Sequence, residues 1–395
     1  MGPLDGVRVL DLTMFVQGPQ AAQLLADLGA DVIKIELPGG GDPARGLVAS
    51  ESDRRSPMFY ALNRGKRSVT LDLRTAAGKA VLLRLARDAD VLLSNFRPGT
   101  LERWGLGYEA LATLNPRLIY ATGSAFGSEG PDAEREGADL NGQAAGGLLS
   151  TLGEDGSFPS PVGAFIADHS ASQNLASGVL AALYARERTG RGQRVDVSLL
   201  GGQIWAQATE FTHFLLTGQV PGRANRGHPL VAGVWRVFAT ADGFLTIAGA
   251  RPPLWAGFCR AIERPDLLDD PRFTGPGVSE AGWRELFAIL EPIFRTRSTA
   301  EWCERLRAEH QRFAPLRSYA EVAADPQVWA NGYLMEVEHP QWGRIAALGH
   351  PIRFSETAAK PGAVAPELGQ HTEEVLIEGG FSWEEIAALR ERGAW

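Results

Sequence analysis

Cysteine is scarce in this sequence, and the two that occur are not placed to form a recognisable site. Cys259 and Cys303 are the only cysteines among 395 residues, and neither has a histidine or a second cysteine at the spacing of a metal ligand. A disulfide framework and a zinc site are therefore not indicated, which fits a reducing compartment. We expect a cytoplasmic protein without a bound metal.

Long apolar runs and dense basic runs are also missing. No stretch approaches the roughly 20 apolar residues that span a bilayer, and the start of the chain lacks the cationic and apolar regions of a secretion signal. The net charge is -8, and lysine and arginine gather nowhere at the density of a nucleic-acid surface. We therefore expect neither a membrane nor a nucleic acid as partner.

Three common motifs of nucleotide binding and nucleophilic catalysis are absent. The first strand-to-helix turn reads D-L-T-M-F-V-Q-G-P-Q, in which Gly18 is the only glycine, although Glu36 ends the second strand as an acidic ribose ligand would. A dinucleotide fold needs three glycines for its backbone to approach a pyrophosphate. Neither a G-x-x-x-x-G-K-[ST] loop nor a G-x-S-x-G elbow occurs. These absences argue against a nicotinamide enzyme, a P-loop nucleotidase and a serine hydrolase.

The first third of the chain alternates short β-like runs with amphipathic helical stretches. This alternation is typical of a parallel sheet with crossover helices, so it predicts an α/β fold with a Rossmann-like sheet. A first helix is expected after Pro19, with Gly29 as its stop, and another over 75–87. Strands are expected over residues 7–12, 31–35, 68–73, 90–93 and 118–122.

After Leu199 a long helical stretch is expected through Leu216, and the loop rich in glycine and proline that follows it indicates a linker to a second domain. Two apolar runs over 234–240 and 244–247 flank Ala-Asp-Gly, which is a strong hairpin signal. In the C-terminal tail, Ser382 and Glu385 predict a helix that begins with a capping box. We predict a large domain over 1–200 that is completed by a tail over about 345–395, a linker over 201–227, a smaller α+β domain over 228–325, and a return linker over 326–344.

Asp168 is the residue on which the chemistry depends. An apolar segment, G-A-F-I-A, leads to it, and a helical stretch rich in small residues follows, closed by T-G-R-G-Q-R. Aspartate at a helix start is most often an N-terminal cap, but it can also be a ligand or a nucleophile. His169 is not an obvious base for it, because adjacent helical residues do not face each other.

Short polar elements occur where strands of the predicted sheet end. In an open α/β sheet, such positions border the crevice in which ligands bind. The candidates are Val16, Gln17, Asn95, Phe96, Asp139 and Asp168.

Several ordered motifs of this sequence resemble the class III coenzyme A transferases, and the match covers nearly the whole chain. The resemblance implies an interlocked homodimer of ring-like chains that moves coenzyme A between an acyl-CoA and a small organic acid, with no tightly bound cofactor. Each active site is then expected between the large domain of one chain and the small domain of the other. The matching stretches are P-L-D-G-V-R-V-L-D-L-T, L-L-A-D-L-G-A-D-V-I-K-I-E, N-R-G-K-R-S-V-T-L-D-L, D-V-L-L-S-N-F-R-P-G-T-L-E-R-W-G-L-G and A-A-L-Y-A-R-E-R-T-G-R-G-Q-R-V-D-V-S-L-L.

By this resemblance Asp168 is the nucleophile, and Gln17 is a second catalytic residue. Asp168 would attack the donor acyl-CoA to give a mixed anhydride, and the freed thiolate would return to make an aspartyl-CoA thioester, which the acceptor carboxylate then attacks. The helix start is expected to keep the carboxylate ionised and to offer amide donors to the oxyanion. The implied coenzyme-binding positions are Val16, Gln17, Leu71, Arg74, Asn95, Phe96 and Arg103.

Two other functions stay open. The α-methylacyl-CoA racemases share the fold and use a histidine from a G-H-D-like motif together with an aspartate, whereas this chain has Ala138 in that motif, and alanine cannot transfer a proton. A non-catalytic acyl-CoA-binding paralogue would keep the coenzyme-binding positions and would not need Asp168.

The sequence leaves the identity of the two acids open. An arginine in the loop before the small domain would suit a dicarboxylate, although it could equally be a solvated linker residue. The stretch R-A-N-R-G-H-P-L-V-A-G-V-W lacks the run of glycines found in formyl-CoA:oxalate transferases, so oxalate is not the expected acceptor. The tentative substrate contacts are Asp139, Asn225, Arg226 and His228.

Overall fold

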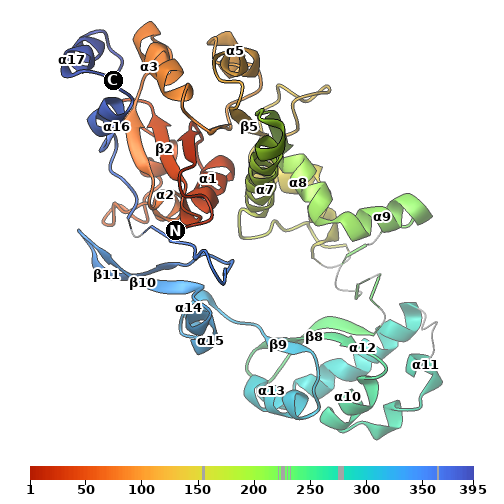
Figure 1. Ribbon diagram of the computed structural model, residues 1–395. Coiled ribbons are helices and arrows are strands. Elements are labelled where there is room, and N and C mark those ends of the chain that lie inside the picture. Colours follow the sequence, from red (N-terminus) through yellow and green to blue (C-terminus); the bar gives the residue numbers. More distant parts are fainter. Residues whose placement is uncertain are drawn as a thin grey trace. The chain divides into compact units, whose positions relative to one another are not determined.

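The computed structural model divides the chain into two compact units (Figure 1). The large unit consists of Met1–Gly146, Val162–Ala206 and Pro326–Trp395, and the small unit of Gly147–Pro161 and Gln207–Asp325. No helix in the described part of the chain is long and apolar enough to cross a lipid bilayer. The structure describes residues 1–153, 156–220, 222–223, 227–228, 230–231, 233–274, 280–362 and 364–395.

A six-stranded parallel sheet forms the centre of the large unit. Its strand order is β3-β2-β1-β4-β5-β6, and every neighbouring pair is parallel. This confirms the predicted α/β fold, because the order is that of a Rossmann-type sheet. The strands are β1 (Arg8–Asp11), β2 (Asp31–Glu36), β3 (Arg67–Thr70), β4 (Val91–Ser94), β5 (Ile119–Ser124) and β6 (Arg194–Ser198).

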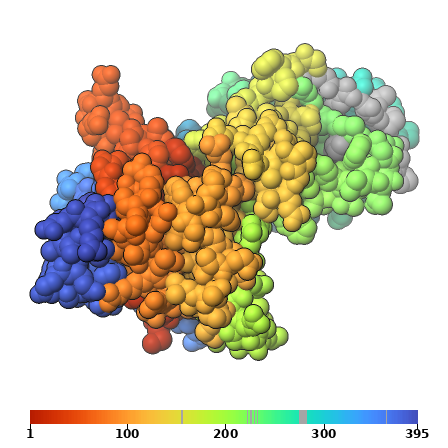
Figure 2. Space-filling model, turned by 90° about the horizontal axis from the view of Figure 1, so that it is seen from above, coloured from red at the N-terminus to blue at the C-terminus, as the bar shows by residue number. Residues whose placement is uncertain are grey.

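Helices cover both faces of this sheet, because successive side chains of a strand point to opposite sides. Leu10 and Ile33 pack in one core, whereas Val9 and Val32 pack in another. In both views the C-terminal helices (blue) lie beside the orange segment that contains α3 (Figures 1 and 2). The first core is covered by α3 (Ala76–Ala86), α5 (Tyr108–Leu114), α16 (Thr372–Glu378) and α17 (Trp383–Glu391). The second core is covered by α1 (Gln17–Asp27) and α7 (Ile166–Thr189).

The remaining elements of the large unit are short. The predicted capping box at the start of α17 is confirmed, because Ser382 Oγ accepts from the Glu385 N–H and the Glu385 carboxylate accepts from the Ser382 N–H. β10 and β11 form an antiparallel pair. These elements are η1 (Pro43–Gly46), α2 (Pro57–Asn63), α4 (Thr100–Arg103), α6 (Asp139–Ala145), α8 (Leu199–Ala206), α15 (Pro326–Ala330), β10 (Leu334–His339) and β11 (Gly343–Leu348).

A three-stranded antiparallel sheet and several helices make up the small unit. The predicted hairpin is confirmed as β7 paired with β8, and β9 pairs with β8 on the other side. Aromatic and aliphatic residues fill the core, where the buried Trp302 indole donates to the Phe294 carbonyl at 2.7 Å. The elements are η2 (Leu148–Thr151), α9 (Ala208–Thr217), β7 (Val234–Ala239), β8 (Phe244–Ala250), α10 (Trp255–Ala261), η4 (Pro265–Leu267), α11 (Pro271–Thr274), α12 (Glu280–Phe294), α13 (Thr299–Ala308), β9 (Phe313–Pro315) and α14 (Tyr319–Ala323).

Two stretches that were expected as linkers contain regular structure. The stretch 201–227 holds most of α8 and all of α9, which ends where Gly218 adopts a left-handed φ of 70°. The stretch 326–344 holds α15 and β10 and belongs to the large unit. The helical stretch expected through Leu216 is therefore confirmed, and the glycine- and proline-rich loop follows it in the sequence.

Candidate active site

The loops that follow β1 and β4 meet at the carboxyl end of the sheet. From β1 the strand order continues through β2 and β3 to one edge of the sheet, and from β4 through β5 and β6 to the other edge. Open α/β sheets bind ligands at the point where the strand order reverses direction in this way. Asn95 follows β4, and its Oδ1 accepts from the Met14 N–H at 2.8 Å while its Nδ2 donates to the Met14 carbonyl at 2.7 Å. Asn95 thus joins the two loops to each other.

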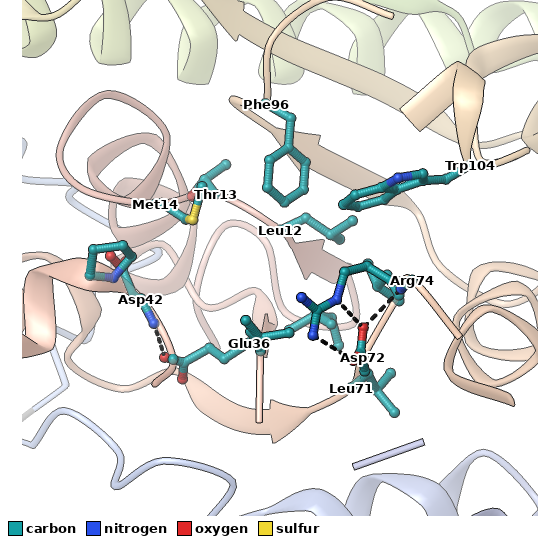
Figure 3. A pocket seen from close by; sticks show the side chains of 15 residues that line it. Leu12, Thr13, Met14, Glu36, Asp42, Leu71, Asp72, Arg74, Phe96 and Trp104 are labelled. Atoms are coloured by element: carbon teal, nitrogen blue, oxygen red, sulfur yellow. Dashed lines mark hydrogen bonds and ion pairs between the residues drawn. The ribbon is translucent and has the colours of Figure 1, made fainter. Parts of the chain in front are cut away.

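A pocket of about 230 Å³ opens at this edge of the sheet (Figure 3). Its lining includes three of the predicted coenzyme-binding residues, Leu71, Arg74 and Phe96. The Phe96 and Trp104 rings lie on the same side of the pocket, with their centroids 5.6 Å apart in an edge-to-face arrangement. The Arg74 side chain is 64% exposed and forms a bidentate pair with Asp72 through Nε and Nη2.

Each carboxylate that lines this pocket has a cationic partner. Glu36 accepts from Nε and Nη2 of Arg45 at 2.8 Å each. Asp42 lies 3.0 Å from the Lys34 ammonium, and Asp72 pairs with Arg74. Glu36 is consequently engaged within the protein and is not free to bind a ribose, which agrees with the missing glycine fingerprint. The pocket presents apolar and aromatic surface with its charges compensated.

Asp168 does not cap its helix, although a cap is the most common role of an aspartate at a helix start. α7 begins at Ile166, so Asp168 is the third residue of the helix. The cap is supplied by Asp139 from the first turn of α6, whose Oδ1 accepts from the N–H groups of Ala167 at 2.7 Å and Asp168 at 3.1 Å. Asp139 is buried, and its second carboxylate oxygen accepts from Nε2 of Gln143.

The expected oxyanion donors at the start of α7 are also occupied. The N–H of Ile166 donates to the Ala164 carbonyl at 2.8 Å, and the N–H of His169 donates to the Phe165 carbonyl at 2.9 Å. Together with the two amides bound by Asp139, these bonds use the first four N–H groups of the helix. Any oxyanion formed at Asp168 must therefore be stabilised by other donors.

Asp168 has an environment that disfavours its charged form. Burial, and secondly the nearby charge of Asp139, raise the pKa of Asp168 from 3.8 to about 7. This corrects the expectation that the helix start keeps the carboxylate fully ionised. A carboxyl group with this pKa is about half ionised at pH 7, and no described residue donates a hydrogen bond to it, so it is free to contact a ligand.

Gln17 lies at the start of α1, close to the start of α7. Its Nε2 donates to the Ser124 carbonyl at the end of β5 at 3.2 Å. One turn later on α1, Gln20 Oε1 contacts both His169 Nδ1 at 2.5 Å and the Ser172 hydroxyl at 2.6 Å. The two helix starts are thereby tied together, so Gln17 and Asp168 belong to the same end of the helix pair.

The other predicted site residues are placed as follows. Val16 is buried as the residue that precedes α1, and Arg103 is an exposed residue of α4 that donates to Thr100 Oγ1 at 3.0 Å. His228 belongs to the small unit, where its Nε2 lies 3.0 Å from a Glu210 carboxylate oxygen. Asn225 and Arg226 lie outside the described residues.

Two residues of the pocket were not predicted from the sequence. Trp104 follows Arg103 at the end of the short helix α4, and its place in the family-like stretch D-V-L-L-S-N-F-R-P-G-T-L-E-R-W-G-L-G was a usable signal. Asp42 caps η1 by accepting from the Ala44 N–H at 2.9 Å, and its position directly before Pro43 is a helix-start signature.

Known proteins similar to this chain show the family to which it belongs. The sequence profile of CoA-transferase family III matches residues 4–372. The succinyl-CoA:glutarate CoA-transferase of Mus musculus is 32% identical, over 96% of this chain and 86% of that protein. The formyl-CoA:oxalate CoA-transferase of Streptomyces coelicolor is 34% identical, over 99% of this chain and 98% of that protein.

A solved structure gives the same result for the fold. A CAIB/BAIF family protein from Brucella suis superposes with a TM-score of 0.84 and 34% identity, and the match covers 96% of this chain and 99% of that protein. The similarity extends over both units of the chain. The family resemblance inferred from the motifs is thus confirmed: the chain belongs to CoA-transferase family III, and it is an acyl-CoA:carboxylate CoA-transferase.

Proposed function

We propose that the enzyme transfers coenzyme A through a covalent thioester on Asp168. One carboxylate oxygen of Asp168 attacks the thioester carbonyl of the donor, which forms a mixed anhydride and releases the coenzyme A thiolate. The thiolate then attacks the Asp168 acyl carbon, so that the donor leaves as a free carboxylate and an aspartyl-CoA thioester remains.

The second half of the proposed reaction reverses these two steps with the acceptor acid. The acceptor carboxylate attacks the aspartyl thioester and expels the thiolate, which gives a second mixed anhydride. Attack of the thiolate on the acceptor acyl carbon forms the new acyl-CoA and returns the Asp168 carboxylate. No net proton or energy source is needed, because one thioester is exchanged for another.

The observation that carries this proposal is the setting of Asp168. Its carboxylate is partly buried beside Asp139, has a pKa raised to about 7, and receives no hydrogen bond from a described residue. A carboxylate that is poorly solvated and unbonded is a stronger nucleophile than one paired with a cation. Gln17, at the neighbouring helix start, is proposed as a donor to the developing oxyanion, since an amide has two N–H donors and one serves Ser124.

The pocket at the ends of β1 to β4 is proposed to hold the coenzyme. Its charge-compensated, aromatic lining suits the nucleobase, with Leu71 and Phe96 in contact with the ring. Arg74 uses Nε and Nη2 for Asp72, and its Nη1 carries two further donors for a phosphate. Arg103, exposed on α4, is proposed as the second phosphate ligand.

We also propose that the active form is a homodimer. Large apolar side chains are exposed on α8 and α9, where Trp205 is 73%, Leu215 is 76% and Leu216 is 80% exposed. Exposed apolar surface of this kind is typical of a protein interface. Size measurement in solution tests the proposal, and a monomer at assay concentration would refute it.

The proposed substrates are a small acyl-CoA donor and a dicarboxylic acid acceptor. The two relatives named above use different donors, and their acceptors, glutarate and oxalate, are both dicarboxylic acids. Glutarate is the better starting candidate, because the sequence lacks the glycine run of the oxalate enzymes. A crossed panel of acyl-CoA donors and free mono- and dicarboxylic acids tests this assignment.

The mechanism is tested by trapping the thioester. Incubation of the enzyme with succinyl-CoA and no acceptor should increase its intact mass by one coenzyme A less one water, and peptide mapping should place the adduct at Asp168. The Asp168→Asn variant should show no adduct. A wild-type enzyme that turns over without an adduct at Asp168 would refute the mechanism, whereas exchange of the donor's α-proton in deuterated water without an acceptor would indicate a racemase.

A further inference from the structure

The loop between β1 and α1 is held at three consecutive peptide groups. The Thr13 carbonyl accepts from the Lys34 ammonium at 2.8 Å, and the Thr13 N–H donates to Asp11 at 2.9 Å. Met14 is bonded at both its N–H and its carbonyl by Asn95, as described above. The Phe15 N–H donates to Asp42 Oδ1 at 3.1 Å. Side chains from different segments of the large unit therefore fix three consecutive residues of this loop, Thr13, Met14 and Phe15.

The charged members of this arrangement are almost completely buried. Lys34 and Asp42 lie 3.0 Å apart with side chains 0% and 1% exposed. A second pair, Lys66 and Asp11, lies 2.8 Å apart with both side chains 0% exposed. Burying ion pairs in place of apolar residues seldom stabilises a protein, because desolvation offsets the attraction. A function in setting geometry explains these pairs better than a contribution to stability.

The loop carries a strained residue directly before the proposed catalytic glutamine. Phe15 has a φ of 64°, and its side chain is 46% exposed. An aromatic residue pays a steric cost of about 1 kcal/mol or more in this left-handed conformation. The ring is not packed in the core, so burial of the ring does not explain the strain. The hydrogen bonds to the loop backbone hold the conformation.

We propose that Lys34 and Asp42 are positioning residues, which hold Phe15 in the left-handed conformation so that α1 begins with the Gln17 side chain directed at Ser124. Reversal of the backbone at Phe15 sets the direction in which α1 departs. A loop relaxed to negative φ would shift Val16 and Gln17 together. This inference rests on the proposed participation of Gln17 in the reaction.

The test compares substitutions of Phe15 that differ in their tolerance of positive φ. Glycine adopts this conformation freely and asparagine adopts it readily, whereas a β-branched residue does so only as an outlier. We expect Phe15→Val to lower kcat by about 10- to 100-fold with the KM for acyl-CoA changed less than about threefold. Phe15→Gly and Phe15→Asn should retain kcat within about threefold and should unfold at the same temperature as wild type or higher.

Substitutions of Asp42 test the same proposal at the side chain that accepts the hydrogen bond from the Phe15 N–H. Asp42→Asn keeps an acceptor oxygen for the Phe15 N–H, and Asp42→Ala removes it, so kcat should fall much further in Asp42→Ala. Asp53→Ala is the matched control, because it removes an exposed carboxylate that pairs with Arg55. Thermal unfolding of every variant shows whether a loss of kcat merely follows a loss of folded protein.

The possible outcomes separate this inference from the proposed function. If wild type forms no adduct on Asp168, the proposed function fails. If wild type forms the adduct and Phe15→Val keeps its kcat, the positioning role is refuted. Equal losses of kcat in the valine, glycine and asparagine variants would also refute it, because they would assign the effect to the ring. An increase of KM in Phe15→Val with kcat unchanged would also refute the positioning role, because it would assign the loop to substrate binding.

Discussion

Replacing Asp139 by asparagine should change the ionisation of Asp168 without removing the cap of α7. Asp139 Oδ1 accepts from the N–H groups of Ala167 and Asp168, and an asparagine Oδ1 can accept the same two bonds. The substitution removes the negative charge beside Asp168. The charge of Asp139 is the second cause of the raised pKa of Asp168, after burial.

The structure limits the size of this effect. The pKa of Asp168 rises from 3.8 to about 7, a difference of about three pH units, and burial causes the larger part. Asp139 therefore contributes at most about 1.5 pH units, and we expect a decrease of about 1 in the variant, which corresponds to about 1.4 kcal/mol. Because a neutral neighbour favours the ionised form, the acid limb of the rate should move from near pH 7 to about pH 6.

The assay is the pH dependence of adduct formation on Asp168 in a single turnover with succinyl-CoA. Relative to its own plateau at high pH, Asp139→Asn should react about fivefold faster than wild type at pH 6. Glu136→Gln is the control, because Glu136 is exposed and pairs with Arg97 at 3.0 Å, so its acid limb should stay in place. An unchanged limb in Asp139→Asn, or a wild-type limb below pH 5, would refute the reasoning.

Three further predictions follow from the same site. Asp168→Asn should increase the free energy of unfolding by up to about 4 kcal/mol at pH 8 and by almost nothing at pH 4, because a raised carboxyl pKa destabilises the folded state as pH rises from 3.8 to 7. Denaturant titrations at both pH values check this, and equal gains at the two pH values would contradict it. Gly123→Ala would place a Cβ 2.4 Å from Gln17 Oε1, so kcat should fall as far as in Gln17→Ala while circular dichroism shows an intact fold; unchanged kcat would contradict the role of Gln17. Trp104→Ala should raise the KM for acyl-CoA about tenfold with kcat unchanged, since it removes an aromatic side chain from the pocket lining. Initial-rate kinetics measure both constants, and a loss of kcat with an unchanged KM would contradict the prediction.

Local signals in the sequence were sufficient for most of the strands and helices of the large unit. Short β-like runs placed β1 to β5 to within a few residues, because these strands are largely buried on both faces and read as nearly continuous apolar segments. The Ala-Asp-Gly turn gave the β7–β8 hairpin, and Ser382 with Glu385 gave the start of α17. Each of these features depends on residues that are close together in the chain.

The sequence predicted the second connection between the two units, and the hydrogen-bond partners of the candidate site residues, less well. Helix α15 and strand β10 occupy a stretch that was expected as a connection, and β10 owes its strand structure to antiparallel pairing with β11. Asp139 was expected only as a tentative substrate contact, and the sequence did not show that this residue caps α7, which begins near a residue 28 positions further along the chain. Asp168 was expected as a nucleophile that the helix start keeps ionised, whereas it is a partly buried residue with a raised pKa.

The sequence by itself determined the family, the parallel sheet and the position of Asp168 at a helix start, because these depend on ordered motifs and on local backbone preferences. Only the tertiary structure decided that Asp139 occupies the amides of α7, that Asn95 bonds Met14, and that Lys34 and Asp42 hold the loop before Gln17. Those contacts join residues between 8 and 81 positions apart. Electrostatic and hydrogen-bond energies depend on distance and burial in space, and neither is set by separation along the chain.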